Sequence, residues 1–260
     1  MKKLLIIIIF CVANVEAGRR FGLQTPLTDD TVGLWHFNRG PDVNTLYDVA
    51  GNNNGDIVGA TWVDSPMGDA LDFNTDRVQW NSNFGSVFES NPTWSIFFWV
   101  KTTDTGDTVF SAPSFWDYRE SSYGADIMNI FLNENNQVQI NYRQYGGSGP
   151  GGHGAYPLSG TSQINDGKWH FIGFTRGTDK ETMKVYVDGI LENERNDVSD
   201  YMSNVSMCSI AARRTYTGSW TSYLDSSFAN LFIINSTLSR SEVKYLYNLQ
   251  APAFGKERIQ

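Results

Sequence analysis

The stretch Trp94-Ser-Ile-Phe-Phe-Trp-Val-Lys101 is the most apolar part of the chain outside its N-terminal run. Most of its side chains are β-branched or aromatic, and such residues favour extended backbone within a sheet. We therefore predict a central β-strand here. Apolar residues make up 40% of the 260 residues and aromatic residues 14%, which is enough to build a substantial core around this strand.

Short strands separated by turns are predicted on both sides of it. Twenty-four Gly residues and many Asn and Asp residues supply the turns. In Met183-Lys-Val-Tyr-Val-Asp-Gly-Ile-Leu191, the pair Asp188-Gly189 favours a tight hairpin, because both residues can adopt a positive φ. Further strands are predicted near 31–37, 56–63, 69–74, 107–111, 126–133, 137–143, 168–176, 206–212 and 228–234.

One helix is predicted near the C-terminus. Ser239 and Glu242 have the spacing of a capping box, in which each side chain satisfies a free amide of the other residue. Val243, Leu246 and Tyr247 then fall on one face of the helix. Many strands with a single short helix indicate an all-β, two-sheet antiparallel sandwich.

This pattern fits one domain over residues 30–250, since an all-β domain can use a chain of this length. Residues 18–29 are expected to lead into the domain. The tail at 251–260 is expected to fray after Pro252.

The N-terminus has the features of a secretory signal peptide over residues 1–17. Two lysines precede an apolar run from Leu4 to Ala13, and a small residue, Ala17, marks the cleavage site. A retained anchor is the alternative, although the run is short for a bilayer span. Cleavage predicts a secreted, extracellular protein without a membrane span in its mature chain. Cys208 then remains as the only cysteine, and we expect it to be a small buried apolar residue.

The net charge of −8 argues against nucleic acid as a partner, because phosphate neutralisation requires a basic face. Neutral ligands, cations and proteins are the partners that an acidic surface favours.

The order of several motifs resembles laminin-G-like domains of the concanavalin-A-like lectin/glucanase superfamily. The motifs are Gly33-Leu-Trp-His-Phe37, Ala70-Leu-Asp-Phe-Asn74, Trp94 to Lys101, Asn165-Asp-Gly-Lys-Trp-His170, Val185-Tyr-Val-Asp-Gly189 and Leu231 to Tyr247. The resemblance implies a jelly roll with one convex and one concave sheet. It also implies a ligand site along the concave face or in the loops at one rim. Members of this superfamily serve as carbohydrate-binding modules, adhesion domains and, in some relatives, glycosidases.

Aromatic residues in three predicted loops suggest a carbohydrate site. Sugar rings stack on aromatic faces, and an aromatic ring with a polar handle suits a half-wet site. The alternative is that single rings fold back into the core. The predicted carbohydrate-binding residues are Trp116, Tyr118, Tyr123, Tyr145, His153, Tyr156, Tyr216 and Trp220. The predicted partner is accordingly a glycan or a glycoprotein.

The resemblance also implies a structural calcium ion, which oxygen ligands would hold. The predicted ligands are Asp48, Asn53, Asn74 and Asp76. Ala229 stands where the family usually has an acidic residue, which removes one charged ligand. The alternative is a turn-forming cluster of Asn and Asp residues.

Three functions remain open at this point. The sequence lacks the E-x-D-x-x-E pattern of the glucanase relatives, and the acidic cluster at 192–197 is interpreted as a solvated strand end, so a non-catalytic lectin-like domain is the main prediction. An adhesion module that binds a protein is the second. A polysaccharide lyase, which requires His153, Tyr156 and Arg143 to converge, is the third.

Overall fold

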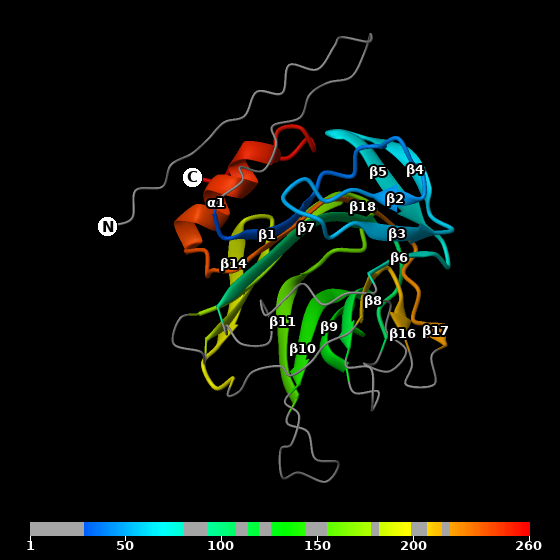
Figure 1. Ribbon diagram of the computed structural model, residues 1–260. Helices are drawn as coiled ribbons and strands as arrows, with labels where there is room; N and C mark the ends of the chain where they lie inside the picture. The colour runs from blue at the N-terminus through cyan, green and yellow to red at the C-terminus, as the bar shows by residue number, and fades with distance from the viewer. Residues whose placement is uncertain are drawn as a thin grey trace.

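The computed structural model describes residues 29–80, 93–107, 114–119, 126–143, 155–177, 182–198, 207–214 and 219–260. The predicted signal peptide and most of the predicted lead-in lie outside these residues. The described chain forms two antiparallel sheets stacked face to face, with helix α1 (Arg240–Gln250) above the upper sheet in Figure 1. The predicted all-β, two-sheet jelly-roll sandwich with one short C-terminal helix is confirmed.

The upper sheet, sheet A, lies between the helix and the lower sheet. Its described strands follow the order β14-β13-β12-β7-β18-β5-β4, and β1 pairs with β18. Strand β7 is central, as predicted, because it pairs with β12 on one side and β18 on the other. The strands of sheet A are β1 (Thr31–Trp35), β4 (Thr61–Ser65), β5 (Gly68–Phe73), β7 (Trp94–Thr102), β12 (Trp169–Arg176), β13 (Met183–Val187), β14 (Ile190–Arg195) and β18 (Ser226–Ile234).

The lower sheet, sheet B, follows the order β11-β10-β9-β8-β15-β6-β3-β2 in the described residues. A separate two-stranded ribbon pairs β16 (Arg213–Arg214) with β17 (Trp220–Thr221). The strands of sheet B are β2 (Thr45–Leu46), β3 (Gly55–Val58), β6 (Arg77–Trp80), β8 (Ser114–Arg119), β9 (Asp126–Leu132), β10 (Gln137–Arg143), β11 (Ala155–Gln163) and β15 (Met207–Ile210).

The central strands of sheet A are buried on both faces, which explains the unbroken apolar run of β7. Ile96, Phe98 and Val100 point into the core between the two sheets. Phe97 and Trp99 point to the other face, where they pack with the buried side of α1. A strand covered on both faces needs apolar residues at every position rather than at alternate ones.

The predicted capping box and hairpin are both confirmed. The Ser239 hydroxyl accepts a hydrogen bond from the Glu242 amide, and the Glu242 carboxylate accepts one from the Ser239 amide. At the hairpin, Asp188 and Gly189 have φ values of 50° and 76°. A Cβ atom on Gly189 would lie 2.7 Å from the Cβ of Tyr247, so the helix packs too closely for any other residue there.

Some predicted boundaries were wrong. The strand predicted at 56–63 is two strands, β3 and β4, which are separated at Gly59 with a φ of 88°. Strands β8 and β11 were not predicted, and Phe115 of β8 is fully buried in the core between the sheets. The strand predicted at 107–111 is described only at Asp107, which forms an isolated bridge with Asn133.

The C-terminal tail is docked onto the domain rather than frayed. Phe254 is buried and stacks on Trp99 with ring centroids 3.9 Å apart. Lys256 donates a hydrogen bond to the Asp188 carboxylate at 2.7 Å. The tail therefore extends the apolar cover that α1 provides over sheet A.

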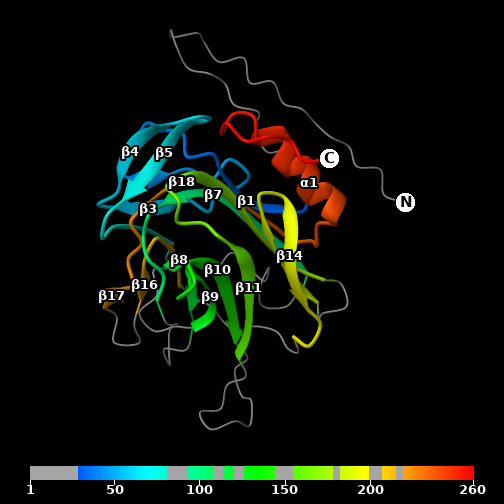
Figure 2. The same ribbon diagram turned by 180° about the vertical axis from the view of Figure 1, so that it is seen from behind.

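One edge of sheet B is closed by side chains of β14, which lies beside β11 in Figures 1 and 2. Glu192 accepts hydrogen bonds from the amides of Thr161 and Ser162, at 2.7 and 3.2 Å. Asn193 donates to the Ser159 carbonyl at 3.1 Å, and Arg195 donates to the Pro157 carbonyl at 2.7 Å. Backbone groups on the edge strand are thereby satisfied.

Candidate functional site

A row of polar positions crosses the outer face of sheet B, the face that points away from sheet A. In adjacent strands these positions lie directly opposite one another, and they alternate with residues of the core. Side chains that are directly opposite lie on the same face of a sheet. We call this set the polar row: Gln79, Ser209, Asn129 and Asn141, with backbone position 117 of β8 between Ser209 and Asn129.

The middle of the polar row is buried and internally hydrogen-bonded. Asn129 is 2% exposed and donates to the Ser114 hydroxyl at 3.0 Å. Asn141 is also buried and accepts from Gln139 at 3.2 Å. Ser209 donates to the Ala212 carbonyl at 2.9 Å. Contact with a ligand is therefore favoured away from this middle part, for example at Gln79 of β6, which is half-buried.

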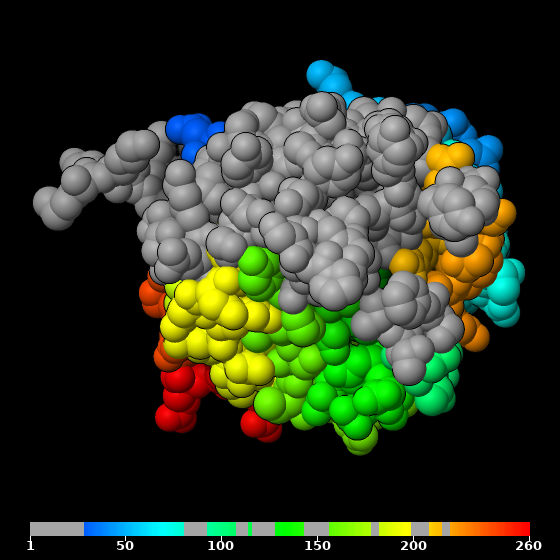
Figure 3. All heavy atoms as spheres, turned by 90° about the horizontal axis from the view of Figure 1, so that it is seen from below, coloured from blue at the N-terminus to red at the C-terminus, as the bar shows by residue number. Residues whose placement is uncertain are grey.

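At β6 the polar row borders a group of cationic and aromatic side chains, and beyond Gln79 the row continues to Asp56 of β3. We call this group the Arg–Trp cluster: Arg77, Gln79, Arg214, Trp220 and Tyr223. The Arg77 guanidinium carbon lies 4.2 Å from the centroid of the Trp220 ring, and that of Arg214 lies 5.7 Å from it. Arg77 Nε also donates to the Gln79 side-chain oxygen at 3.0 Å. In Figure 3 the orange atoms of the chain around β17 border this face of the molecule.

The local sequence places these side chains together. Arg77 and Gln79 alternate with buried Val78 and Trp80 along β6, so both point away from the core. In the ribbon, Trp220 is directly opposite Arg214. The sequence predicted Trp220 as a site residue but missed Arg77 and Gln79, which lie more than a hundred positions earlier in the chain.

The electrostatics of Arg77 combine burial with charged neighbours. Burial lowers the pKa of its guanidinium, and the positive charge of Arg214 acts in the same direction. Tyr223 and Asp76 oppose this effect and favour the charged form. An arginine remains protonated under such conditions, so the cluster presents a half-buried positive charge.

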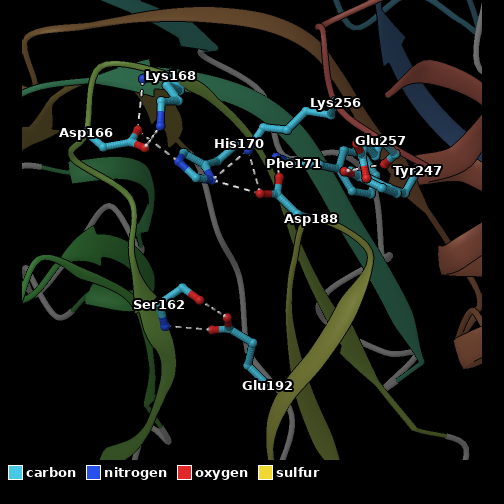
Figure 4. A network of polar contacts seen from close by, with 10 residues as sticks. All are labelled: Ser162, Asp166, Lys168, His170, Phe171, Asp188, Glu192, Tyr247, Lys256 and Glu257. Carbon is cyan, nitrogen blue, oxygen red and sulfur yellow. Dashed lines mark hydrogen bonds and ion pairs between the residues drawn. The ribbon is translucent and has the colours of Figure 1, made fainter. Parts of the chain in front are cut away.

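A second polar network, the C-terminal clamp, lies elsewhere in the molecule and is drawn in Figure 4. It consists of Asp166, His170, Asp188 and Lys256. His170 Nδ1 lies 3.0 Å from an Asp188 oxygen, and its Nε2 lies 3.1 Å from an Asp166 oxygen. Asp188 also accepts from the Phe171 amide and from Lys256. This network ties β12 to the 188–189 hairpin and to the C-terminal tail.

The two carboxylates of the clamp are stabilised in their charged forms. Burial raises the pKa of Asp166, but hydrogen bonds from the Lys168 amide, His170 and the Lys168 side chain outweigh it and lower the pKa to about 2. Burial likewise raises the pKa of Asp188, and bonds from His170, Lys256 and the Phe171 amide outweigh it, so the pKa lies below its ordinary value. Both groups act as hydrogen-bond acceptors that hold three elements together.

The predicted carbohydrate-binding rings are only partly described. Trp116 and Tyr118 lie on β8, with side chains outside the described part, and Tyr123, Tyr145, His153 and Tyr216 lie outside it altogether. Tyr156 is half-buried against the core, and the Arg195 guanidinium carbon lies 5.2 Å from its ring centroid. It comes from the edge strand β11, whereas Trp220 stacks against Arg77 of β6, so these two rings do not share one site.

The four predicted calcium ligands lie in two places. The Asp48 carboxylate accepts hydrogen bonds from the amides of Leu34, Ala50 and Asn53, at 2.9 to 3.1 Å. The Asn53 side chain donates to the Val32 carbonyl. These side chains thus already have partners within their own turn.

Asn74 and Asp76 lie at the opposite end of β3 and β6. The Asn74 amide donates to the Asp76 carboxylate at 3.1 Å, and Asp76 lies against Gly59. From the strand register, this end is roughly 15 Å from the Asp48 turn, at about 3.3 Å per residue. One ion cannot contact both pairs, and no group of three or more His, Cys, Asp or Glu suited to a metal occurs among the described residues.

Two other predictions concern reactive groups. Cys208 is a fully buried residue of the core between the sheets, as predicted. For the lyase alternative, His153 and the Arg143 side chain lie outside the described residues, so their convergence with Tyr156 stays a prediction.

Comparison with solved structures finds the same fold in parts of several larger proteins. A Trypanosoma rangeli sialidase in complex with sialic acid superposes with a TM-score of 0.62 at 16% identity, over 88% of this chain and 34% of that chain. The binding domain of botulinum neurotoxin serotype D gives 0.59 at 15% identity, over 86% and 52%. The binding domain of Paraclostridial Mosquitocidal Protein 1 gives 0.63 at 14% identity, over 88% and 55%. The chain thus spans between one third and just over half of these proteins, and identities this low show the fold alone.

No curated protein sequence matches the chain. Within the described residues, none of the helical structure is both long and apolar enough to cross a membrane. A family model described as the concanavalin A-like lectin/glucanases superfamily matches residues 72–244, more than half of the chain. This chain therefore belongs to the concanavalin A-like lectin/glucanase superfamily.

Proposed function

We propose that this protein is a secreted, non-catalytic lectin-like domain that binds a glycan or glycoprotein at the outer face of sheet B. The observation that carries the proposal is the Arg–Trp cluster beside the polar row at β6. It combines an indole ring, two guanidinium groups and an amide on one half-buried surface. Sites for small molecules combine apolar rings with a few placed polar groups in this way.

Saccharide chemistry fits these groups. A sugar ring has apolar C–H faces, which pack against aromatic rings, and hydroxyls, which need hydrogen-bond partners. Gln79 supplies a donor and an acceptor, and the arginines supply donors. The Arg–Trp cluster therefore has the functional groups that a saccharide requires.

Complexes of structurally similar proteins support a glycan or glycoprotein partner at the level of analogy. They include a sialidase with sialic acid, and a binding domain of botulinum neurotoxin DC both with SialylT and with rat synaptotagmin II. One fold hosts many functions, so the argument for this chain rests on its own residues.

The absence of a glucanase-type E-x-D-x-x-E pattern from the sequence supports a non-catalytic role, because glycosidases need two carboxylates beside the scissile bond. The apolar run before Ala17 supports secretion. A structural calcium ion at one of the two Asn/Asp turns is part of the proposal, and it has its own test below.

Glycan-array screening of protein purified after expression of the full chain tests the function. We expect binding to at least one glycan class, and we expect Trp220→Ala to weaken it by about tenfold, since stacking and positioning are both lost. Tyr245→Ala is the matched control, because Tyr245 is an exposed aromatic residue on α1. Failure of the folded protein to bind any glycan would exclude the lectin function and leave the adhesion module, whose ligand is a protein.

A further inference from the structure

We propose that His170 makes the docking of the C-terminal tail sensitive to pH, because a proton on its imidazole opposes the docking of Lys256. Lys256 anchors the tail in the C-terminal clamp, directly beside His170 (Figure 4). Imidazole is the side chain whose charge ordinarily changes between about pH 5 and pH 8. The inference concerns the tail and is independent of the ligand that the domain binds.

The first argument is that His170 and Lys256 share one carboxylate oxygen. His170 Nδ1 lies 3.0 Å from an Asp188 oxygen, and Lys256 Nζ donates to that same oxygen at 2.7 Å. Lys256 Nζ also lies 3.3 Å from Nδ1 itself. A neutral imidazole with its proton on Nε2 can accept a hydrogen bond from Lys256 at Nδ1. A protonated imidazole cannot, because Nδ1 then carries a hydrogen and donates to Asp188.

The second argument is the balance of charge. The charged groups whose contacts reach the imidazole, directly or through a carboxylate, are Asp166 and Lys168 from the segment before β12, Asp188 from the hairpin and Lys256 from the tail. Two carboxylates and two ammonium groups balance without a charge on His170. A proton on the imidazole adds a positive charge beside Lys256, and like charges repel. The two side chains are only 9% and 19% exposed, so water and salt screen this repulsion poorly.

The other ionisable groups of this region keep their charge between about pH 5 and pH 8. The pKa of Asp166 is about 2, and the pKa of Asp188 lies below its ordinary value. On α1, burial raises the pKa of Tyr247 to about 12, and the charges of Asp188 and Glu257 act in the same direction. A change in tail docking within this pH range is therefore attributed to the imidazole.

The direction of the effect follows from what the tail adds to the site. Asp166 and Asp188 belong to the domain, so they attract a protonated imidazole whether or not the tail is docked. Docking adds the ammonium group of Lys256, which disfavours the protonated form. Since linkage is reciprocal, protonation of His170 disfavours docking to the same extent. Docking is therefore strongest near pH 8 and weakens as the pH falls toward about 5.

The tail covers aromatic side chains of sheet A, so its release has a structural consequence. Phe254 stacks on Trp99 with ring centroids 3.9 Å apart, and its centroid lies 5.2 Å from that of Trp169. Lys256 follows two positions later, and its amide donates to the Ala251 carbonyl at 2.9 Å. Loss of the Lys256 anchor therefore loosens the segment that holds Phe254 and opens the side of Trp99 that this ring covers.

Hydrogen–deuterium exchange of protein purified after expression of the full chain tests the inference. Exchange is measured by mass spectrometry at about pH 5.5 and about pH 8, and each rate is divided by the intrinsic rate at that pH. The docked tail contains protected amides such as that of Ile259, which donates to the Asn248 side chain of α1. We expect the protection of the tail to be about threefold or more lower at the acidic pH, while that of β7 stays unchanged.

Variants assign the pH dependence to the two groups. His170→Gln has no charge at either pH and should give equal tail protection at both. Lys256→Met removes the ammonium group, so it should lower the protection and also make it equal at the two pH values. His36→Gln is the matched control, because His36 is another half-buried histidine but bonds to Asn230 rather than to the tail. This control should keep the full pH dependence.

The inference is overturned if the unchanged protein shows equal tail protection at both pH values, or greater protection at the acidic one. It is also overturned if the pH dependence persists in the folded His170→Gln variant. Thermal melts check folding. If His170→Gln does not fold, Lys256→Met decides in the same way, since persistence of the pH dependence without the ammonium group contradicts the competition.

Discussion

At the scale of single residues, Asp48 shows how one carboxylate organises a turn. Its two oxygens receive three backbone amides, from residues before and after it in the sequence, and it is itself buried. The Asn53 carbonyl in the same turn accepts hydrogen bonds from the indoles of Trp35 and Trp80. The turn therefore connects β1 to the core.

We predict that Asp48→Ala lowers the free energy of unfolding by about 2–4 kcal/mol, because it leaves buried amides without an acceptor. Urea denaturation measures the change. Asp42→Ala is the control, since Asp42 accepts only local hydrogen bonds in an exposed turn. Equal midpoints for the Asp48→Ala variant and the unchanged protein would contradict this role for the carboxylate.

At the scale of elements, the C-terminal clamp makes stability dependent on pH. The pKa of Asp166 is lowered to about 2, and that of Asp188 lies below its ordinary value. A carboxylate whose pKa is lower in the folded state stabilises the fold above its unfolded pKa, near 3.9. This stabilisation is lost as the pH falls from about 4 toward 2.

We therefore expect the urea concentration at the unfolding midpoint to decrease as the pH is lowered from 5 to 2. In the Asp166→Asn variant this decrease should be less steep. The side-chain amide of that variant does not titrate. One proton-binding group therefore no longer contributes to the pH dependence of the free energy of unfolding. Glu134→Gln, in the exposed turn between β9 and β10, is the control. Parallel pH profiles for Asp166→Asn and the unchanged protein would show that the clamp does not contribute.

The docked tail supports a second prediction for elements. Phe254→Ala should cost about 3 kcal/mol and expose the tail to protease, because the ring stacks on Trp99 in a buried site. Differential scanning calorimetry and limited proteolysis report the two effects. Pro252→Ala, at an exposed position of the same segment, should change neither.

Strands β8 and β11 were not predicted from the sequence, and each has a physical reason for this. Strand β11 contains Pro157 and Gly160, which usually mark loops. Proline is tolerated there because β11 is an edge strand, which does not need every amide for pairing. Strand β8 mixes aromatic, acidic and basic residues, so its pattern matched an aromatic loop.

At the scale of the whole molecule, calcium is the proposal that thermal stability can test. If an ion binds at the Asp48 turn or the Asp76 turn, excess calcium should raise the melting temperature relative to chelator. Mass action gives about 2.7 kcal/mol at a hundredfold excess over the dissociation constant. Asp76→Ala should remove the increase if that turn holds the ion, and should keep it if the Asp48 turn does. Identical melting temperatures in the two buffers would contradict the proposal.

The fold of the whole molecule was predictable because its cues are local. Alternation, the Asp188-Gly189 turn and the capping box each depend on neighbouring residues, and their order along the chain matched a superfamily. The Arg–Trp cluster was only half predictable. Trp220 was predicted as a site residue because it is aromatic. Its contact with Arg77 depends on the position of the β16–β17 ribbon beside β6, and local sequence patterns do not predict that position.

The closure of β11 by β14 has a consequence for solubility. An open edge strand offers its free amides and carbonyls to any extended chain, and this pairing is a common start of aggregation. Here Glu192, Asn193 and Arg195 occupy those groups with side chains that carry charge or an amide. A domain with such an edge resists fibril growth by strand addition on that side, even at high concentration.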